Sequence, residues 1–394
     1  MRLWQVVLVA IVALLAAGQL GGDDFIDAGG VLWRPVITIA AIMVLTAAAG
    51  RLGVVERVAL IMSPWAQRSP RRLLLVVFAL GLGTSVVLNN DSAVLLVVPI
   101  VVTLVRQLYP GRNDVAAWFA LVVFMAAGVA PLMVSNPMNL IVAEYAGMSF
   151  NAYAARMLPV AVAGWVVAFA VLRFAGRAVP PAMGPGPATA TASSRARWTA
   201  AQVRALALVL GILVAYPTAS YLGIPVWVVA VAGAGLAALL CVRHGVGSYA
   251  DIVRRDIAWG VLVFLAGMFV VAIGLRNAGV VDALERLYDD ANLAVIGATS
   301  AVGSALINNH PMGLLNLLAI DPSPGGDHQP ILAALVGGDL GPRLLPTGSL
   351  AGVLLYATLH RLEVRLSVRR FCAVGALVTI PTLVVSLIVL AFTT

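Results

Sequence analysis

The sequence predicts an all-α polytopic membrane protein, and two observations carry this prediction: the composition and the recurrence of long apolar segments. Of the 394 residues, 61% are hydrophobic and only 11% are charged, and the mean hydropathy is +1.00. Soluble domains are less apolar than this. Uncharged runs of about 20 residues are long enough to cross the hydrocarbon core of a lipid bilayer as helices. The chain is therefore expected to be embedded in lipid.

Nine apolar segments are predicted to cross the membrane, and two more are predicted to be helical hairpins. The predicted spans are 3–20, 33–52, 115–143, 157–175, 204–220, 225–243, 258–276, 331–360 and 371–392. The predicted hairpins are 72–108 and 293–320, each of which polar residues interrupt in the middle. Re-entrant backbone is tolerated at membrane depth only where protein buries it or where it lines a wet cavity. The amphipathic segment 53–68 is expected to lie along the membrane surface.

The arginines orient these segments. All 25 basic residues are Arg; the loops on one side of the predicted membrane, together with Arg2, hold 20 of them. The opposite loops hold only Arg34, Arg156, Arg276 and Arg286. By the positive-inside rule, the arginine-rich side is cytoplasmic, with the N-terminus inside and the C-terminus outside a bacterial cytoplasmic membrane. Arginines that are spread over short loops in this way set the topology of the chain in the membrane. They do not indicate a nucleic-acid partner.

The two halves of the chain carry the same features in the same order. LGTSVVLNNDSAVLLVVPI (82–100) resembles VGSALINNHPMGLLNLLAI (302–320), and GRLGVVERV (50–58) resembles RNAGVVDAL (276–284). Each half then has a span broken by Pro and polar residues, 115–143 and 331–360. We interpret residues 1–175 and 204–394 as two repeats joined by a cytoplasmic linker, 176–203. Five predicted spans separate equivalent points, so the repeats are inverted, which is the layout of secondary transporters and argues against a channel or a receptor.

The polar residues at the hairpin tips and at the breaks are candidate ligands for a polar solute. They are Asn89, Asn90, Asn136, Asn139, Asn308, Asn309, Thr347 and Ser349. Amide and hydroxyl groups donate and accept hydrogen bonds, without the desolvation cost of a fixed charge. The alternative is that these side chains cap the half-helices on which they lie.

Asp91, Asp339 and His310 are candidate proton-coupling residues. An ionised Asp at a helix centre costs about 2.5–3.5 kcal/mol on insertion into a membrane. Asp91 has no base near it in the sequence, so burial favours its protonated form and predicts proton exchange. Arg343 follows Asp339 by four residues, so Asp339 either couples protons or forms a structural ion pair with Arg343. For His310, the roles of proton acceptor, solute ligand and helix cap remain open.

Several motifs resemble the arsenical-pump membrane proteins, the arsenite permeases of the ion-transporter superfamily. These are NND followed by VPI, APLMVSNPMNLIVAEYAG (130–147), GLRNAG, INNHP, and GGDLGPRLLPTGSLA (337–351), of which the stretch Asp339 to Ser349 is the most specific. The resemblance runs from about residue 33 to the C-terminus. It implies export of arsenite and antimonite, in exchange for protons or with help from a soluble arsenical-pump ATPase subunit. It also implies that the solute is an uncharged trihydroxide, whose O–H groups suit Asn amides.

The resemblance leaves alternatives for the solute. Sodium/proton antiporters and carboxylate or anion carriers belong to the same superfamily. The chain departs from the family pattern at His310-Pro311-Met312, at Gly338 and at Pro137. The first half also has one span fewer than the second ahead of its hairpin, which we interpret as loss of a span or as a start site placed too late.

The sequence predicts a transporter and not an enzyme. It contains no G-x-x-x-x-G-K-[ST] phosphate-binding loop and no Lys, so we expect no ATP hydrolysis by this chain and no cofactor. Cys241 and Cys372 lie away from the tips and are expected to pack in the core rather than to bind arsenic. A monomer and a homodimer are equally compatible with the sequence.

Overall fold

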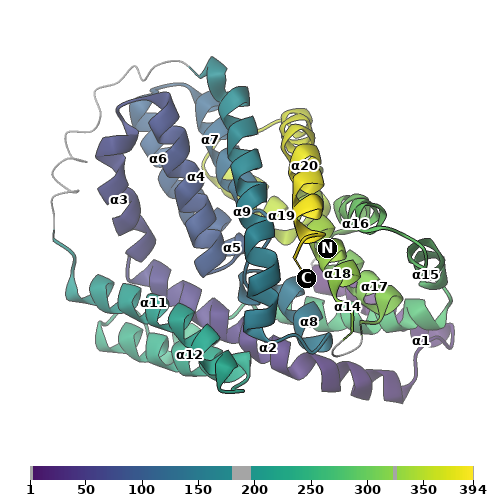
Figure 1. Cartoon of the computed structure of the whole chain (residues 1–394). Helices are drawn as coiled ribbons and strands as arrows, with labels where there is room; N and C mark the ends of the chain where they lie inside the picture. The colour runs from purple at the N-terminus through teal and green to yellow at the C-terminus, as the bar shows by residue number, and fades with distance from the viewer. Residues whose placement is uncertain (1–2, 180–196, 323–325, 394) are drawn as a thin grey trace.

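The computed structural model describes residues 3–179, 197–322 and 326–393, and within these ranges it contains helices and no strands (Figure 1). Eight helices in these ranges are long and apolar enough to cross a membrane, judged by length and composition. This confirms the predicted all-α polytopic class.

The first half consists of twelve helical elements. They are α1 (Leu3–Ala16), α2 (Gly22–Arg51), α3 (Val54–Ala66), α4 (Pro70–Val87), α5 (Asn90–Ser92), the π-helical turn η1 (Ala93–Val97), α6 (Val98–Leu108), α7 (Asn113–Ala126), the 3-10 turn η2 (Met133–Ser135), α8 (Pro137–Tyr145), α9 (Phe150–Ala175) and the 3-10 turn η3 (Gly176–Ala178).

The second half repeats this plan. Its elements are α11 (Ala200–Tyr221), α12 (Val226–Arg243), α13 (Tyr249–Asp251), the π-helical turn η4 (Ile252–Asp256), α14 (Trp259–Asn277), α15 (Asp282–Tyr288), α16 (Leu293–Ile307), α17 (Asn309–Ile320), α18 (Gln329–Leu340), the 3-10 turns η5 (Gly341–Arg343) and η6 (Pro346–Gly348), α19 (Leu350–Arg361) and α20 (Val368–Leu390).

The interrupted segments of the sequence are interrupted helices in the structure. The hairpin predicted over 72–108 consists of α4 and the continuous helix 90–108, and the hairpin predicted over 293–320 consists of α16 and α17. The broken spans are α7 with α8 and α18 with α19, each separated by 3-10 turns and irregular residues. Six further predicted spans are the single long helices α2, α9, α11, α12, α14 and α20.

The boundary between the first two helices differs from the prediction. The predicted span 3–20 is helical only over Leu3–Ala16, which is shorter than the roughly 20 residues that cross a bilayer. The predicted loop that follows is mostly the start of α2. Asp23 and Asp24 lie in its first turn, where negative charge favours a helix N-terminus, and the Gly21 N–H donates to the Asp24 carboxylate at 2.7 Å. The prediction considered apolar residues alone and assigned these turns to a loop.

Most of the predicted linker, 176–203, lies outside the described residues. Gly176–Ala178 forms a 3-10 turn, and residues 180–196 lie outside the described residues. α11 begins at Ala200, where the Thr199 hydroxyl accepts the Gln202 N–H at 3.2 Å. Residues 200–203 are therefore helix because a capping residue precedes them.

Equivalent elements of the two halves make equivalent contacts. α4 packs on α7 and α16 packs on α18, so each hairpin lies against the broken helix of its own half. A glycine permits each close approach: Gly81 faces the Val123 backbone, and Gly337 faces the Gly297 backbone. α1 packs on α14 as α12 packs on α2, and α9 and α20 lie side by side near the middle of the molecule (Figure 1).

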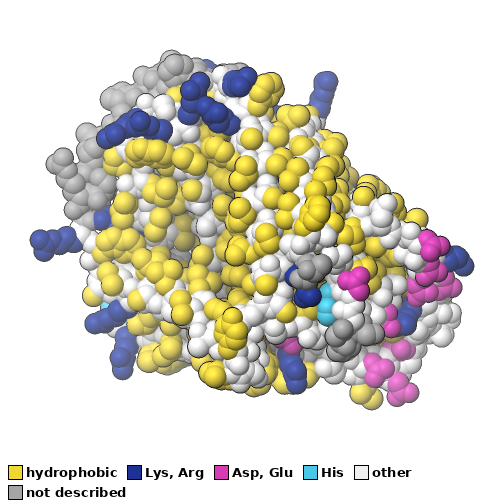
Figure 2. All heavy atoms as spheres, viewed as in Figure 1, with side chains coloured by type: hydrophobic (Ala, Val, Ile, Leu, Met, Phe, Trp, Pro, Cys, Tyr) yellow, Lys and Arg dark blue, Asp and Glu magenta, His cyan; other side chains and the backbone are white. Residues whose placement is uncertain are grey.

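The surface is apolar between two differently charged ends. Figure 2 shows arginines gathered near the ends of α7, α9 and α12, and acidic side chains gathered over α15 and the start of α2 on the right. Large apolar side chains such as Val166, Val214 and Ile388 are more than half exposed between these ends. Such a surface suits contact with lipid tails flanked by two polar faces.

Candidate functional site

Hydrogen bonds within its own turn hold the first hairpin tip. Asn89 caps the helix 90–108, because its Oδ1 accepts the N–H and the hydroxyl of Ser92, both at 2.7 Å. The Ser85 hydroxyl donates to Oδ1 of Asn90. Neither the Asn89 nor the Asn90 NH₂ group donates a hydrogen bond to another described residue. The π-helical turn η1 follows directly, and such turns are frequent at functional sites.

The second tip repeats this plan. Asn308 has a φ of +81°, a region that Asn enters more readily than most residues. Its Oδ1 accepts the backbone N–H of His310 at 3.2 Å, and its amide donates to the carbonyl of Thr347 at 3.2 Å. The second bond ties the tip to the break between α18 and α19. The neighbouring Asn309 is 7% exposed, and its Oδ1 has no hydrogen-bond partner within the described part of the chain.

The carboxylate of Asp339 accepts three N–H groups from the first half. The Asn136 amide donates to Oδ1 at 2.6 Å, and Oδ2 accepts the Ala130 N–H at 2.8 Å and the Asn139 amide at 3.0 Å. Tyr153 completes the network by accepting from Asn139 at 2.7 Å and donating to the Ala130 carbonyl at 3.1 Å. Hydrogen bonds to a charged group contribute about 1.5–3 kcal/mol each, which offsets the cost of burying this carboxylate.

Arg343 does not pair with Asp339, contrary to the structural ion pair considered from the sequence. Among the described residues, no ion pair joins the two side chains. The carboxylate instead takes the donors from α8 and from the break before it, roughly 200 residues away in sequence. Arg343 is 1% exposed and donates from Nη2 to the Ala127 carbonyl at 2.8 Å. Asp339 lies in α18 and Arg343 in the 3-10 turn η5, so a spacing of four residues across the break does not bring the two charged groups within ion-pair distance.

Both tips and both breaks line one small cavity of about 30 Å³, called here the central cavity. Its polar lining consists of Asn90, Asp91, Asn136, Asn309, His310, Asp339, Arg343 and Ser349. A space of this size admits one or two water-sized molecules, so an oxyacid with several oxygen atoms fits only after the surrounding segments move apart. The structure thus gathers most of the predicted site residues, although they come from four separate segments of the sequence.

Four helices begin at the central cavity. They are the helix 90–108, α8, α17 and α19, and the first residue or two of each line the cavity. Their N-caps are Asn89, Asn136, Asn308 and Ser349, each of which accepts a backbone N–H of its helix. The predicted capping role therefore applies to these four. A helix N-terminus carries a partial positive charge, so the cavity lies where four positive ends meet.

Two larger cavities adjoin the central one. The Asp91 cavity, of about 470 Å³, extends from Asp91 past Thr46 to Arg51 and Asp256. The His310 cavity, of about 770 Å³, has an apolar lining from α1, α14 and Phe264, whose ring meets His310 edge-on with centroids 6.3 Å apart. Leu350, at the start of α19, lines all three cavities. Each tip thus separates the central cavity from one larger space.

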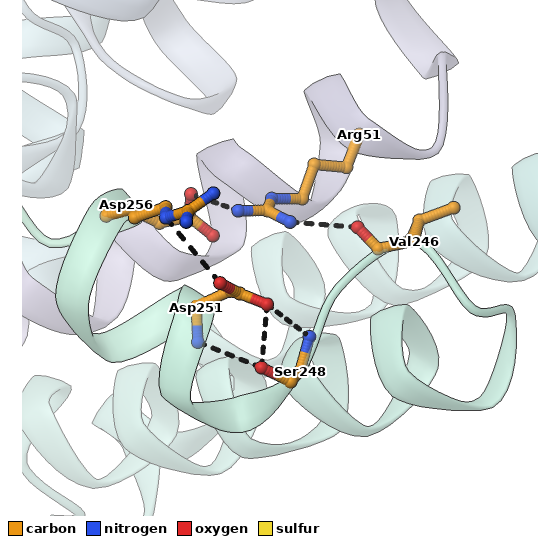
Figure 3. Close-up of polar contacts among 6 residues, drawn as sticks. Arg51, Val246, Ser248, Asp251 and Asp256 are labelled. Carbon is orange, nitrogen blue, oxygen red and sulfur yellow. Dashed lines mark hydrogen bonds and ion pairs between the residues drawn. The ribbon is translucent and has the colours of Figure 1, made fainter.

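The far end of the Asp91 cavity is tied by an ion pair between the two halves (Figure 3). Arg51, at the end of α2, donates to Oδ1 of Asp256 at 2.7 Å and to the Val246 carbonyl at 2.8 Å. Next to this pair, Ser248 and Asp251 cap each other. The hydrogen bonds from Ser248 hold the pKa of Asp251 below its usual range. This cluster belongs to the arginine-rich side.

The remaining predicted residues lie around the central cavity. Asn89 lines the Asp91 cavity, and Asn308 and Thr347 line the His310 cavity. Asn139 is not part of the lining of the central cavity, and its amide donates a hydrogen bond to the Asp339 carboxylate. Solute ligation by any of these side chains stays a prediction. Cys241 is buried and Cys372 partly buried, and neither lines one of these three cavities.

Sequence reasoning missed Tyr153 and the Arg51–Asp256 pair. A tyrosine near the start of an apolar span is common at a membrane interface, so Tyr153 gave no specific signal. Arg51 was counted as a loop arginine that sets topology. Its pairing with Asp256 joins residues 205 apart in sequence, and only the packing of α2 against the second half reveals it.

Paired hairpins, broken helices and a polar cavity at their meeting point define a secondary-transporter type of membrane protein. Comparisons with known proteins agree. The family model described as citrate transporter (CitMHS) matches residues 1–338. An arsenical pump membrane protein of Escherichia coli is 30% identical over 98% of this chain and 92% of its own length. One of Yersinia enterocolitica has the same identity and coverage. The chain therefore belongs to the CitMHS transporter family, among the arsenical pump membrane proteins that the sequence motifs resemble.

Two further comparisons mark the breadth of this similarity. An uncharacterized transporter of Mycobacterium tuberculosis is 27% identical over 98% of this chain. The crystal structure of the Alcanivorax borkumensis YdaH transporter, described as having an unusual topology, aligns with a TM-score of 0.59 at 15% identity, covering 100% of this chain and 98% of that one. At this identity the likeness concerns the fold.

Proposed function

We propose that this protein exports arsenite and antimonite across the bacterial cytoplasmic membrane in exchange for protons. The observation that supports this most is the central cavity, where Asn and Ser side chains of both halves face a common space beside Asp91. The names of the relatives in Escherichia coli and Yersinia enterocolitica support the choice of solute.

In this proposal the arginine-rich side faces the cytoplasm, in accordance with the positive-inside rule. Solute enters from that side through the Asp91 cavity once the Arg51–Asp256 pair opens. Asp91 alternates between protonated and ionised forms as the protein changes its access. It suits this role because its carboxylate makes no hydrogen bond or ion pair within the described residues and lines two cavities.

Proton exchange supplies enough free energy for useful export. One proton entering per neutral solute moves one charge inward, which at a membrane potential of about 150 mV yields roughly 3.5 kcal/mol. That corresponds to a concentration ratio of a few hundredfold. A soluble ATPase subunit would raise this limit without being needed for basal export.

Transport into everted membrane vesicles tests the proposal. Arsenite and antimonite are expected to accumulate when respiration energises vesicles that contain the protein, without added ATPase subunit, and a protonophore is expected to abolish the accumulation. Vesicles carrying Asp91→Asn are the matched control. Accumulation that persists with the protonophore would refute proton coupling, and absence of accumulation would refute arsenite export.

A carboxylate carrier is the second candidate. The family model is described as citrate transporter, and the cavity contains a cation, Arg343. The same vesicles should therefore be given citrate and sodium in parallel with arsenite. Citrate transport without arsenite transport would favour this candidate, and sodium transport would favour a sodium/proton antiporter.

A further inference from the structure

Arg343 is a buried cation with unused hydrogen-bond donors. It is 1% exposed and lines the central cavity. Nη2 donates to the Ala127 carbonyl, whereas Nε and Nη1 have no acceptor among the residues that the structure describes. A buried donor without a partner costs about 1–3 kcal/mol. The site is therefore built for an acceptor that the described chain does not supply.

The charges around the cavity favour an anion. Each helix N-terminus is equivalent to roughly +0.5 of an elementary charge, so the four that begin here contribute about +2. Arg343 adds one positive charge, and Asp91 and Asp339 together subtract two when both are ionised. The balance is about +1. The Asp339 carboxylate is already bonded to three N–H groups, so it leaves the guanidinium available.

The same cavity also offers a free acceptor. Oδ1 of Asn309 is buried without a hydrogen-bond partner in the described part of the chain. A ligand that matches both groups presents a negatively charged oxygen to Arg343 and a hydroxyl to Asn309. An oxyacid that has lost one proton has both features, whereas a fully neutral acid lacks the charge that pairs most strongly with a guanidinium.

We propose that Arg343 binds a negatively charged oxygen of the solute, so that the site holds a small oxyacid as its monoanion. This inference rests on the proposed function for the identity of the solute, and it replaces the neutral trihydroxide as the bound form. When neutral arsenous acid enters, one O–H bond breaks and its electron pair stays on the oxygen beside Arg343. The proton passes to the carboxylate of Asp91, which lines the same cavity.

Binding of arsenite to the purified protein tests this assignment. Charge-assisted hydrogen bonds contribute about 1.5–3 kcal/mol, so Arg343→Gln should weaken binding by about 10- to 100-fold. Arg343→Lys keeps the charge without the planar fork and should bind with intermediate affinity. Arg57→Gln is the matched control, because Arg57 is also a buried arginine, at 6% exposure, but lies in α3. Unchanged arsenite affinity in a folded Arg343→Gln protein would overturn the proposal.

A second variant keeps the test decisive if Arg343→Gln does not fold. Asn309→Asp is nearly isosteric and adds negative charge to the same 30 Å³ cavity, where it pairs with Arg343 and repels an anion. Arsenite affinity should fall by at least about tenfold. The new carboxylate repels the bound anion, and Arg343 is no longer available as its counter-ion. If Asn309→Asp binds arsenite with wild-type affinity, the proposal that the solute is bound as a monoanion is overturned as well.

Citrate serves as a parallel probe that separates this inference from the proposed function. If the wild-type protein binds citrate but not arsenite, and Arg343→Gln loses citrate binding, the anion site is upheld while arsenite export is refuted. If arsenite binds equally well to wild type and to Arg343→Gln, arsenite export is upheld and the anion site is refuted. If the wild-type protein binds neither oxyacid, both ideas are refuted.

Discussion

The two hairpin tips share one backbone plan and differ in the residue that follows the Asn pair. In both tips the first Asn caps the helix that follows, at Asn89 and at Asn308. The third position is Asp91 in the first tip and His310 in the second. The repeat therefore fixes how a tip is built, whereas a single side chain sets what each tip contributes chemically.

The cavities beside the two tips also differ in their chemistry. The Asp91 cavity contains Thr46 and ends at the Arg51–Asp256 pair, so polar groups line it from the tip to the arginine-rich side. The His310 cavity is larger and mostly apolar, and an aromatic ring lies against the imidazole. A proton path needs polar groups or water. Polar and charged residues follow the Asp91 cavity from the tip to the Arg51–Asp256 pair, whereas those of the His310 cavity, which are Asn308, His310 and Thr347, lie only at the tip and the adjoining break. We expect the two tips to be unequal in function despite their equivalent folds.

Removing the acid at the first tip should have the largest effect. Asp91→Asn keeps the shape and cannot take up a proton, so export driven by a proton gradient should be abolished. The measurement is proton efflux from energised everted vesicles on addition of arsenite, with protein amount checked by immunoblot. Proton efflux at the wild-type rate would remove Asp91 from the coupling mechanism.

Much of the fold was readable from the sequence because its cues are local. Asn89-Asn90 and Asn308-Asn309 interrupt apolar runs and mark the hairpin tips, and Pro137 and Pro346 mark the breaks. Each such residue disturbs a helix within its own segment, so no knowledge of the rest of the chain is needed. The predicted start of α2 was wrong because polar residues do not always end a helix. Asp23 and Asp24 are polar, yet their negative charge stabilises a helix N-terminus.

The site was readable only in part because its contacts are long-range. The residues of the central cavity were predicted as a set, since polar groups buried in a membrane protein have few other purposes. Their pairing was not predictable. Asp339 bonds to Asn136 and Asn139, which are 203 and 200 residues away, whereas Arg343, four residues away, lines the same cavity without pairing with it. Spacing along a helix carries no information about such partners.

The next largest effect should come from the packing of the second hairpin. In Gly337→Ala the new methyl group meets the backbone of Gly297 and Ala301, which no side-chain rotation relieves. In the equivalent contact of the first half, Gly81→Ala meets the Val123 carbonyl at 3.0 Å, which a small shift accommodates. Overpacking costs about 1–3 kcal/mol, so Gly337→Ala should lower the thermal midpoint of the purified protein more than Gly81→Ala does.

Gly338→Ala is the matched control for this comparison. A methyl group there meets only the hydroxyls of Ser300 and Ser304, at 3.7 and 3.8 Å, and should leave the thermal midpoint unchanged. A midpoint for Gly81→Ala below that of Gly337→Ala would show that the two halves do not pack as the structure indicates.

A smaller effect is expected from the second Asn of each pair. Asn90 and Asn309 both line the central cavity, so loss of one neutral hydrogen bond should weaken arsenite binding by about 2- to 12-fold. If both contact the same solute, the double alanine variant should lose less binding free energy than the sum of the single losses. Calorimetric titration of the four proteins decides this, and strict additivity would show that the two side chains do not contact a common solute.

The smallest effect should come from His310. His310→Gln removes the titratable ring but keeps the backbone N–H that Asn308 accepts, so the capped tip is preserved. The ring loses its edge-on contact with Phe264, which is worth about 0.5–1.5 kcal/mol for an aromatic pair, and the contact of its Nδ1 with Oδ1 of Asn308 at 3.2 Å. Arsenite transport should fall only a few-fold. Proton efflux per arsenite, measured in the same vesicles as for Asp91→Asn, should remain at the wild-type ratio. If His310→Gln loses coupling while Asp91→Asn retains it, the two tips have the opposite division of roles, and the apolar cavity beside His310 then contains the proton path.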